Sequence, residues 1–251
     1  TTGTWSNRTM PAPYSGASVY KGVRRLTPEG RLGATSPDVG AGGCTVAISD
    51  DHGLTCSRLA MFSPFQAAKQ VAYSPTLDVY CVAMGFAAGP FGIAYSDDGG
   101  VTWHAATING VTPATVALQD VVWIPWLGLF VAGGNTLLGL GTAYSSDGIN
   151  WTFNTGAGSG LALQIAYSDN LIVAAAGTTN NVYVTTDGIA WAAHAVGGAQ
   201  PYSNIAWNGQ VFCATTYATN TETATAPDGV TWTRRQNEPD PNFHGIAARW
   251  I

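Results

Sequence analysis

Short apolar runs separated by turn residues recur along most of the chain. Each unit reads as an apolar segment, a turn that contains Pro, Asp, Asn or Gly, and a second apolar segment. The clearest copies are VAYSPTLDVYCVAMG (71–85), VVWIPWLGLFVAGG (121–134), IAYSDNLIVAAAG (165–177) and IAWNGQVFCAT (205–215), and VRRLTPEGRLGAT (23–35) fits the same frame with Arg at the usual aromatic position. Because the runs are short and bounded by turn signals, each unit predicts a pair of β-strands rather than a helix.

A second pattern lies downstream of each of these units. Its good copies are SDDGGVTW (96–103), SSDGINW (145–151), TTDGIAW (185–191) and APDGVTW (226–232), and SDDHGLTC (49–56) is a degenerate copy with Cys56 in place of Trp. Consecutive tryptophans in the good copies are 48, 40 and 41 residues apart. Each repeat therefore contains four short strands within about 40 to 48 residues, which is typical of a β-propeller blade.

The repeats predict an all-β fold, a single β-propeller domain over residues 1–251 with four-stranded antiparallel blades. Five full blades fall at about 16–62, 66–107, 116–155, 162–196 and 202–236. The end segments 243–251 and 1–10 resemble a first and a last strand, so we expect them to share an incomplete sixth blade. Joining the chain ends in one blade would remove two open sheet edges. A five-bladed ring and a fragment of a longer array are the alternatives.

The S/T-x-D-G-x-x-W pattern resembles the Asp-box, also called the BNR repeat. The resemblance covers nearly the whole chain and implies a β-propeller whose box forms the turn between the third and fourth strands of each blade. Proteins with this repeat include sialidases, other glycoside hydrolases, photosystem assembly factors, sorting receptors and many phage virion proteins. Repeats such as AYSPTLDVYCVAMG followed by AYSDDGGVTW are most similar to those of phage tail and fibre proteins.

The recurring Asp and Trp of this pattern are expected to be structural. An Asp carboxylate can accept hydrogen bonds from the backbone N–H groups of its own turn. Gly follows because the turn requires a positive φ, and Trp fills the space beneath with a large apolar surface. The residues concerned are Asp98, Trp103, Asp147, Trp151, Asp187, Trp191, Asp228 and Trp232. Catalysis rarely needs the same Asp at equivalent places in four blades, so we assign these residues no catalytic role.

Composition narrows the class of protein further. The 251 residues carry a net charge of −5, which argues against a nucleic-acid partner, since nucleic-acid-binding surfaces are basic. No apolar run is long enough for a transmembrane helix, so no membrane insertion is expected. The chain has no signal peptide and begins at Thr1 rather than Met, so we expect a processed or excerpted sequence.

The four cysteines form no CxxC pair, which argues against a structural zinc site. Cys44 and Cys56 flank one turn, but a hairpin centred near Asp51 would not place them opposite each other, so the sequence disfavours a disulfide there. Cys81 and Cys213 occupy similar places in their repeats and are expected to fill the core on equivalent strands. The cysteines therefore do not indicate whether the protein works in an oxidising or a reducing compartment.

An enzymatic role is not expected. A sialidase-like site would need arginines from several blades and a Tyr–Glu pair, but residues 59–233 contain no Arg. A glycosidase needs two carboxylates that face each other across a sugar. Outside the repeated turns the candidates are Asp38, Asp120, Glu222, Glu238 and Asp240, and a glycosidase built on Glu222 and Asp240 is the enzymatic alternative. No HxH, HExxH or GK[ST] occurs, so neither a metal nor a cofactor is expected.

The loops predict where a ligand would bind. In a propeller blade, the turn between the first and second strands and the turn between the third and fourth strands lie on the same face. That face therefore holds every copy of the Asp pattern. The loops on the opposite face differ in length and content, and variable loops on a rigid scaffold are a usual place for recognition. Their amides and aromatic rings suit a neutral sugar or a protein surface. The candidates are Asn180, Asn181, Tyr202, Tyr217, Asn220, Glu222 and Asn242, with Phe86 and Phe91 as stacking platforms.

Aromatic residues at the ends of the first strands form another recurring set. They are Tyr73, Trp123, Tyr167 and Trp207. Regular recurrence predicts packing between blades rather than a stacking platform. Trp126 breaks the pattern, because it lies in the turn between a first and a second strand. It is a candidate contact for a partner subunit or a neighbouring domain.

These observations predict a non-enzymatic binding propeller of a virion or another extracellular assembly, of the phage tail or fibre kind. The expected partners are a cell-surface glycan or protein receptor and other virion or assembly subunits. A purely structural propeller that docks into a larger assembly is the first alternative. A glycoside hydrolase of sialidase-like architecture is the second.

Overall fold

The computed structural model describes residues 21–36, 44–61, 67–85, 92–110, 116–136, 139–154, 164–177, 179–198, 200–216 and 222–236. These residues form five sheets, which are antiparallel except for one parallel pair at the edge of the third, and they contain no helix. The predicted all-β propeller with four-stranded antiparallel blades is therefore confirmed. The segments 1–10 and 243–251 lie outside the described residues, so their sharing of a sixth blade stays a prediction.

Each sheet is one blade, and its strands follow one another in the sequence. The first blade contains β1 (Lys21–Arg25), β2 (Leu32–Ser36), β3 (Cys44–Ser49) and β4 (Ser57–Met61). The second contains β5 (Ala68–Ser74), β6 (Val79–Met84), β7 (Ile93–Ser96) and β8 (His104–Ala105). The third contains β10 (Val116–Ile124), β11 (Leu129–Thr136), β12 (Gly139–Ser145) and β13 (Asn150–Asn154), with β9 (Thr107–Asn109) added at its edge. The fourth contains β14 (Gln164–Tyr167), β15 (Ile172–Ala175), β16 (Asn181–Thr185) and β17 (Ala192–Ala195), and the fifth contains β18 (Tyr202–Trp207), β19 (Phe212–Thr216), β20 (Glu222–Ala226) and β21 (Thr233–Gln236).

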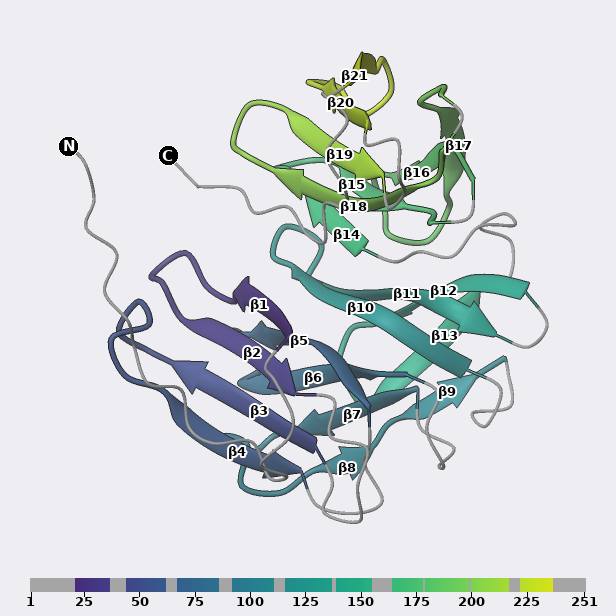
Figure 1. The fold of residues 1–251 in the computed structure, drawn as a ribbon. Helices are drawn as coiled ribbons and strands as arrows, with labels where there is room; N and C mark the ends of the chain where they lie inside the picture. Colours follow the sequence, from purple (N-terminus) through teal and green to yellow (C-terminus); the bar gives the residue numbers. More distant parts are fainter. Residues whose placement is uncertain are drawn as a thin grey trace.

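The first strand of every blade lies on the inside of the molecule. Figure 1 shows β1, β5, β10, β14 and β18 near a common centre, with the later strands of each blade farther out. The contacts between neighbouring blades join these inner strands, β1 and β2 with β5, β5 with β10, β10 with β14, and β14 with β18. The blades are therefore arranged in sequence order around one axis.

The core lies between blades and not within one of them. Four apolar clusters occupy the four interfaces between consecutive blades. The second strand of a blade is buried on both faces, as in β6, where all six residues are buried, whereas the short outer strand β8 is exposed. A strand that is covered on both faces needs a continuous apolar run, which is why these runs dominate the sequence.

The recurring aromatic residues pack between blades, as predicted. Tyr73 pairs with Tyr80 across β5 and β6, and their ring centroids are 4.5 Å apart. Trp123 makes the equivalent pair with Phe130 at 4.7 Å. Tyr73 is 8% exposed and Trp123 is 7% exposed, and each belongs to the cluster between its own blade and the preceding one. Offset aromatic pairs of this kind add to the free energy of burial.

The cysteines also follow the repeat. Cys81 pairs with Ala72 and Cys213 with Ala206, so the two thiols occupy equivalent positions on β6 and β19. Cys81 is fully buried, whereas Cys213 is half-buried. All four cysteines are free, in agreement with the expectation that Cys44 and Cys56 form no disulfide.

The third blade has a fifth strand, whereas four were expected. Residues 107–109 were expected to lie at the end of the second blade and in the connection that follows it, but they form β9, which pairs in parallel with β13. The backbone N–H of Thr107 also donates to the carbonyl of Ile149 at 2.9 Å. The outer edge of β13 offers unpaired backbone groups, and the connection covers that edge.

A buried carboxylate ties three blades together at the axis. Asp120 on β10 is 0% exposed, and its Oδ2 accepts the backbone N–H of Ile165, in the fourth blade, at 2.7 Å. From the first blade, the Arg24 guanidinium donates to both oxygens of Asp120, each at 2.7 Å, and to the carbonyl of Val121 at 2.6 Å. A buried charge is stable only when it is paired and hydrogen-bonded, and Arg24 and Ile165 supply these partners.

The repeat provides a neutral version of the same tie. Gln164 precedes Tyr167 by three residues, as Asp120 precedes Trp123, and its Oε1 accepts the N–H of Ile205 in the next blade at 2.9 Å. Gln70 holds this position in the second blade, but the N–H of Val121 is already bonded to Asp120 at 2.8 Å. The buried Oε1 of Gln70 is accordingly left without a hydrogen bond.

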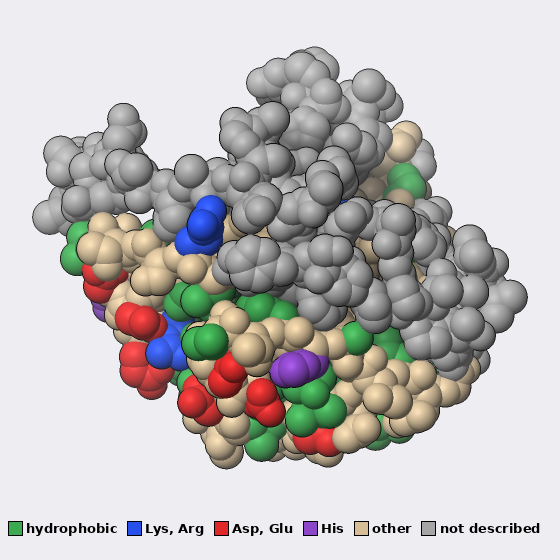
Figure 2. All heavy atoms as spheres, turned by 90° about the horizontal axis from the view of Figure 1, so that it is seen from below, with side chains coloured by type: hydrophobic (Ala, Val, Ile, Leu, Met, Phe, Trp, Pro, Cys, Tyr) green, Lys and Arg blue, Asp and Glu red, His purple; other side chains and the backbone are tan. Residues whose placement is uncertain are grey.

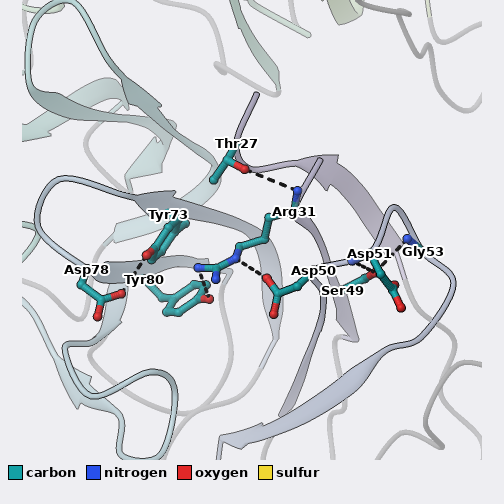
Figure 3. Close-up of polar contacts among 9 residues, drawn as sticks. All are labelled: Thr27, Arg31, Ser49, Asp50, Asp51, Gly53, Tyr73, Asp78 and Tyr80. Atoms are coloured by element: carbon teal, nitrogen blue, oxygen red, sulfur yellow. Dashed lines mark hydrogen bonds and ion pairs between the residues drawn. The ribbon is translucent and has the colours of Figure 1, made fainter. Parts of the chain in front are cut away.

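Arg31 of the first blade contacts the second blade nearer the surface, and it also pairs with Asp50 of its own blade. Figure 3 shows the Arg31 side chain lying between the rings of Tyr73 and Tyr80 and the carboxylate of Asp50. The guanidinium carbon lies 4.5 Å from the Tyr73 ring centroid, and Nη1 donates to the Tyr80 hydroxyl at 3.0 Å. Burial raises the pKa of Tyr80 to about 12 although Arg31 acts to lower it, so this hydroxyl stays protonated as an acceptor.

The two ion pairs should differ in their effect on stability. Replacing Asp120 by Ala leaves the Arg24 charge and the Ile165 N–H without their partner, and we expect the free energy of unfolding to fall by roughly 3–5 kcal/mol. Asp50→Ala removes an exposed partner of Arg31 and should cost less than about 1 kcal/mol. Urea unfolding followed by tryptophan fluorescence measures both. Equal losses in the two variants would contradict the role given to Asp120.

Candidate functional site

The recurring Asp-Gly segments form tight turns between the third and fourth strands of the blades. We call residues 49–56, 96–103, 145–151, 185–191 and 226–232 the Asp turns. In the third blade, Asp147 Oδ1 accepts the N–H groups of Ile149 and Asn150 at 2.8 and 2.7 Å and the hydroxyl of Ser145 at 2.9 Å. The Trp151 indole N–H donates to the carbonyl of Gly148 at 2.9 Å, and the Trp151 side chain is fully buried.

The glycine of this turn is required for two reasons. Gly148 has φ of +77°, which L side chains rarely adopt. A Cβ atom at this position would also lie 2.9 Å from the Sγ atom of Cys81 in the second blade. The Asp turn of the third blade therefore packs directly on the second blade, and Gly100, Gly188 and Gly229 lie against the preceding blade in the same way.

The other Asp turns repeat this arrangement with local differences. Asp98, Asp187 and Asp228 each accept two backbone N–H groups of their own turn. The fifth blade has Ala226 where the others have Ser or Thr, so its turn lacks the hydroxyl bond. Asp51 makes the same bonds to Thr55 even though Cys56 replaces Trp, so the degenerate copy keeps the turn.

These hydrogen bonds lower the pKa values of the turn carboxylates. Bonds from Thr55 hold the pKa of Asp51 at about 2, and bonds from Thr102 do the same for Asp98. Burial acts to raise the pKa of Asp147, but bonds from Asn150, Ile149 and Ser145 outweigh it and bring the value to about 2. A carboxylate with so low a pKa is a poor proton donor or acceptor near neutral pH, and each of these three carboxylates is already engaged by its own turn.

Figure 2 shows that acidic side chains gather toward one edge of the surface seen from below. Exposed carboxylates of the first two Asp turns include Asp50, Asp97 and Asp98. We call the face that holds the Asp turns, together with the turns between first and second strands, the Asp-turn face. The remaining loops lie on the opposite face.

On the opposite face the structure brings three of the predicted ligand residues together. Tyr202 begins β18 and Glu222 begins β20, and the Tyr202 hydroxyl donates to Glu222 Oε2 at 3.3 Å. Arg234 on β21 donates to Glu222 Oε1 at 2.9 Å. Asn180 donates from Nδ2 to the carbonyl of Gly198 at 3.0 Å, and a Cβ on Gly198 would collide with the Glu222 carboxylate.

This group ties loops to the fifth blade and leaves little for a ligand. Tyr202 is 0% exposed and Glu222 is 6% exposed, so neither offers a free surface. Burial and the neighbouring Glu222 raise the pKa of Tyr202 to about 12. Asn181 lies beside this group, at the start of β16, and is half-buried. The other predicted ligand residues, Tyr217, Asn220, Asn242, Phe86 and Phe91, lie outside the described residues.

A cavity of about 650 Å³ opens on the Asp-turn face instead. Its walls come from the turns between first and second strands of four blades, with Pro28, Pro75, Trp126 and Asp169 as one residue from each. These turns surround the inner strands, so the cavity is the mouth of the central axis. Its volume lies within the range of about 300–1,000 Å³ that is typical of small-ligand sites.

Two rings form a corner of this cavity. Trp126 and Tyr167 lie with centroids 5.6 Å apart and planes inclined by 58°. Trp126 is 37% exposed, as its unusual place in the repeat suggested. Sequence reasoning found Trp126 but missed the cavity, because Tyr167 was assigned to packing and the turn of the unit 165–177, which contains Asp169, to a link between two strands. Both assignments hold for the backbone, and the side chains still border the cavity.

The described residues contain no group of three or more His, Cys, Asp or Glu side chains that could hold a metal ion. In the same part of the chain, no helix is long and apolar enough to cross a membrane.

Acid should destabilise the protein through the Asp turns. Their pKa values in the folded chain lie below the ordinary value of 3.8, so the stabilisation is present above about pH 4 and is lost as the pH falls toward 2. We expect the melting temperature of the double variant Asp98→Asn and Asp147→Asn to depend less on pH over this window than that of the wild type. Asp169→Asn, which leaves the Asp turns intact, is the control and should keep the wild-type slope. Identical slopes for all three proteins would contradict the assignment.

Comparison with known proteins identifies the fold. No family model matches the chain, and no curated protein sequence matches it. A virginiamycin B lyase from Staphylococcus aureus, solved with quinupristin, superposes with a TM-score of 0.73 at 13% identity over 96% of this chain and 78% of that one. A chain of the nidogen/laminin complex gives 0.67 at 11% identity over 92% and 84%.

A third match is the GH74 enzyme from Niastella koreensis, with a TM-score of 0.65 at 18% identity over 86% of this chain. The chain spans only 38% of the length of that enzyme. The three proteins include enzymes and a component of a protein complex, at identities that establish architecture alone. By its fold, this chain is a β-propeller.

Proposed function

We propose that this chain is a non-enzymatic binding propeller of a virion or another extracellular assembly, which contacts a glycan or a protein receptor on a cell surface. The observation that carries this proposal is that its buried carboxylates and those of the Asp turns already have partners within the protein. Among the residues that the structure describes, the two buried ones, Asp120 and Glu222, are paired with Arg24 and Arg234. Those of the Asp turns accept hydrogen bonds from their own backbone, so each of these carboxylates already has a structural partner.

The strongest argument for a hydrolase is the Tyr202–Glu222 pair, because a sialidase-like reaction uses such a pair. The geometry does not suit that chemistry. A nucleophilic Tyr must reach the sugar and lose its proton, whereas Tyr202 is fully buried and has a pKa raised to about 12. Arg234 also donates to Glu222 Oε1 at 2.9 Å, so this carboxylate is already engaged by a neighbouring strand. The pair supports the fifth blade rather than a reaction.

A binding role agrees with the rest of the molecule. The inner strands are fixed to one another by side-chain ties at the axis, so the loops and turns project from a rigid frame. Rigid frames with variable loops favour recognition. The similarity of the repeats to those of phage tail and fibre proteins supports a place on a virion.

Binding and hydrolysis can be measured on the same protein. We expect the chain to bind a subset of structures on a glycan array and to release no fluorophore from 4-methylumbelliferyl glycosides. Turnover that disappears in Glu222→Gln or Asp240→Asn would establish a glycosidase and overturn the proposal. An absence of glycan and cell binding, together with extensive contacts in the parent particle, would favour a purely structural propeller instead.

A further inference from the structure

We propose that the cavity on the Asp-turn face is a binding site for a neutral pyranose unit of a glycan, which stacks on Trp126. This inference rests on the proposed binding function and assigns it to the face opposite the variable loops. The cavity is bordered by Trp126, Tyr167, Arg25 and Asp169 together with three prolines.

The two aromatic rings fit a ligand that has one flat apolar surface and one edge. The Trp126 and Tyr167 planes are inclined by 58°, so a ligand that lies flat on Trp126 meets Tyr167 with its side. A pyranose ring has an apolar C–H face and a rim of hydroxyl groups, and stacking on an aromatic ring buries the apolar face while it leaves the rim free. The 37% exposed Trp126 offers an accessible surface for this contact.

The polar groups favour a neutral ligand. Arg25 and Asp169 carry opposite charges and border the same cavity, so its described lining has no net charge and prefers neither an anion nor a cation. Asp169 is exposed and accepts no hydrogen bond from the described residues, so its carboxylate is free to accept two hydroxyl groups. Two neighbouring hydroxyl groups of a sugar can donate to the two oxygens of one carboxylate.

Arg25 is already positioned to donate. Its Nε–H is bonded to the carbonyl of Thr27 at 3.0 Å, and Nη2 donates to the carbonyl of Pro28. These bonds fix the plane of the guanidinium, while Nη1 has no acceptor among the described residues. A fixed donor loses little conformational entropy when a ligand binds.

The walls are rigid before a ligand arrives. Pro28, Pro75 and Pro125 restrict φ in three of the four turns around the cavity. The turn of the first blade is closed by the Leu26 N–H, which donates to the Arg31 carbonyl at 2.7 Å. Preorganised walls favour affinity because less motion is lost on binding.

The second blade has a different residue at the place that Trp126 occupies in the third. The turns 75–78 and 125–128 have the same length, since Ser74 pairs with Val79 and Ile124 with Leu129. Thr76 therefore stands where the third blade has Trp126. A turn of this length does not need an aromatic residue, so the indole ring is available for recognition, and Trp126→Thr is a substitution that the same turn already accepts.

The test is fluorine NMR on the full chain labelled with 5-fluorotryptophan. Its nine tryptophans give separate probes, and Trp126→Thr identifies the Trp126 signal by its disappearance. The ligands are methyl β-glucoside, methyl β-galactoside, methyl α-mannoside and the methyl β-glycoside of N-acetylglucosamine, each titrated alone. We expect at least one of them to move the Trp126 signal saturably. Trp126→Thr should weaken binding of that sugar, measured by calorimetry, by at least about tenfold.

Two controls and a competing ligand decide the outcome. Leu77→Ala changes an exposed residue of the matching turn in the second blade and should leave the affinity unchanged, as should Asn180→Ala combined with Asn181→Ala on the opposite face. If no sugar moves the Trp126 signal, or if only a decaproline peptide does, this inference is overturned. Glycan-array binding that persists in Trp126→Thr would then keep the proposed function and place its site elsewhere. An array that is silent for the wild type, together with an absence of binding to cells, would overturn both.

Discussion

The Asp120 carboxylate is the constraint on which the centre of the molecule depends. It is fully buried, and it holds Arg24 of the first blade and the Ile165 N–H of the fourth blade at hydrogen-bonding distance. A buried charge needs such partners, so the inner strands must keep their relative positions for Asp120 to keep its hydrogen bonds. Arg24 also lies close enough to Tyr167 to lower the pKa that burial raises. The Arg24–Asp120 ion pair therefore lies near Tyr167, which borders the cavity. It connects the packing of the inner strands with the cavity at the end of the axis.

The two faces of the propeller use their polar residues differently. On the opposite face, the group of Tyr202, Glu222 and Arg234 is bonded within the scaffold. On the Asp-turn face, the outer turns have structural Asp residues, whereas the inner turns leave Trp126 and Asp169 exposed. The repeat therefore stabilises the outer part of this face and departs from its own pattern near the axis. A departure from the repeat without a packing role is the feature that most favours recognition.

The fold could be predicted from the sequence because its causes are local and repeated. The apolar pairs define the inner two strands, and the Asp and Gly of each turn define the outer two. Packing of Tyr73 and Trp123 between blades followed from their recurrence. The candidate site could be predicted only in part. Trp126 was visible as an exception, but the cavity also needs Arg25 and Asp169, which lie in other repeats and meet only when the blades surround the axis. Likewise, nothing in the local pattern indicates that Arg24 crosses from the first blade to Asp120 in the third.

A crystal structure of the chain soaked with the sugar that binds most tightly tests the central claim most directly, because it reports the location of the ligand without a mutation. We predict a pyranose ring stacked on Trp126, with hydroxyl groups within hydrogen-bonding distance of Asp169 and Arg25. A sugar bound beside Asn180 and Asn181 on the opposite face, with the cavity at the axis unchanged, would contradict it.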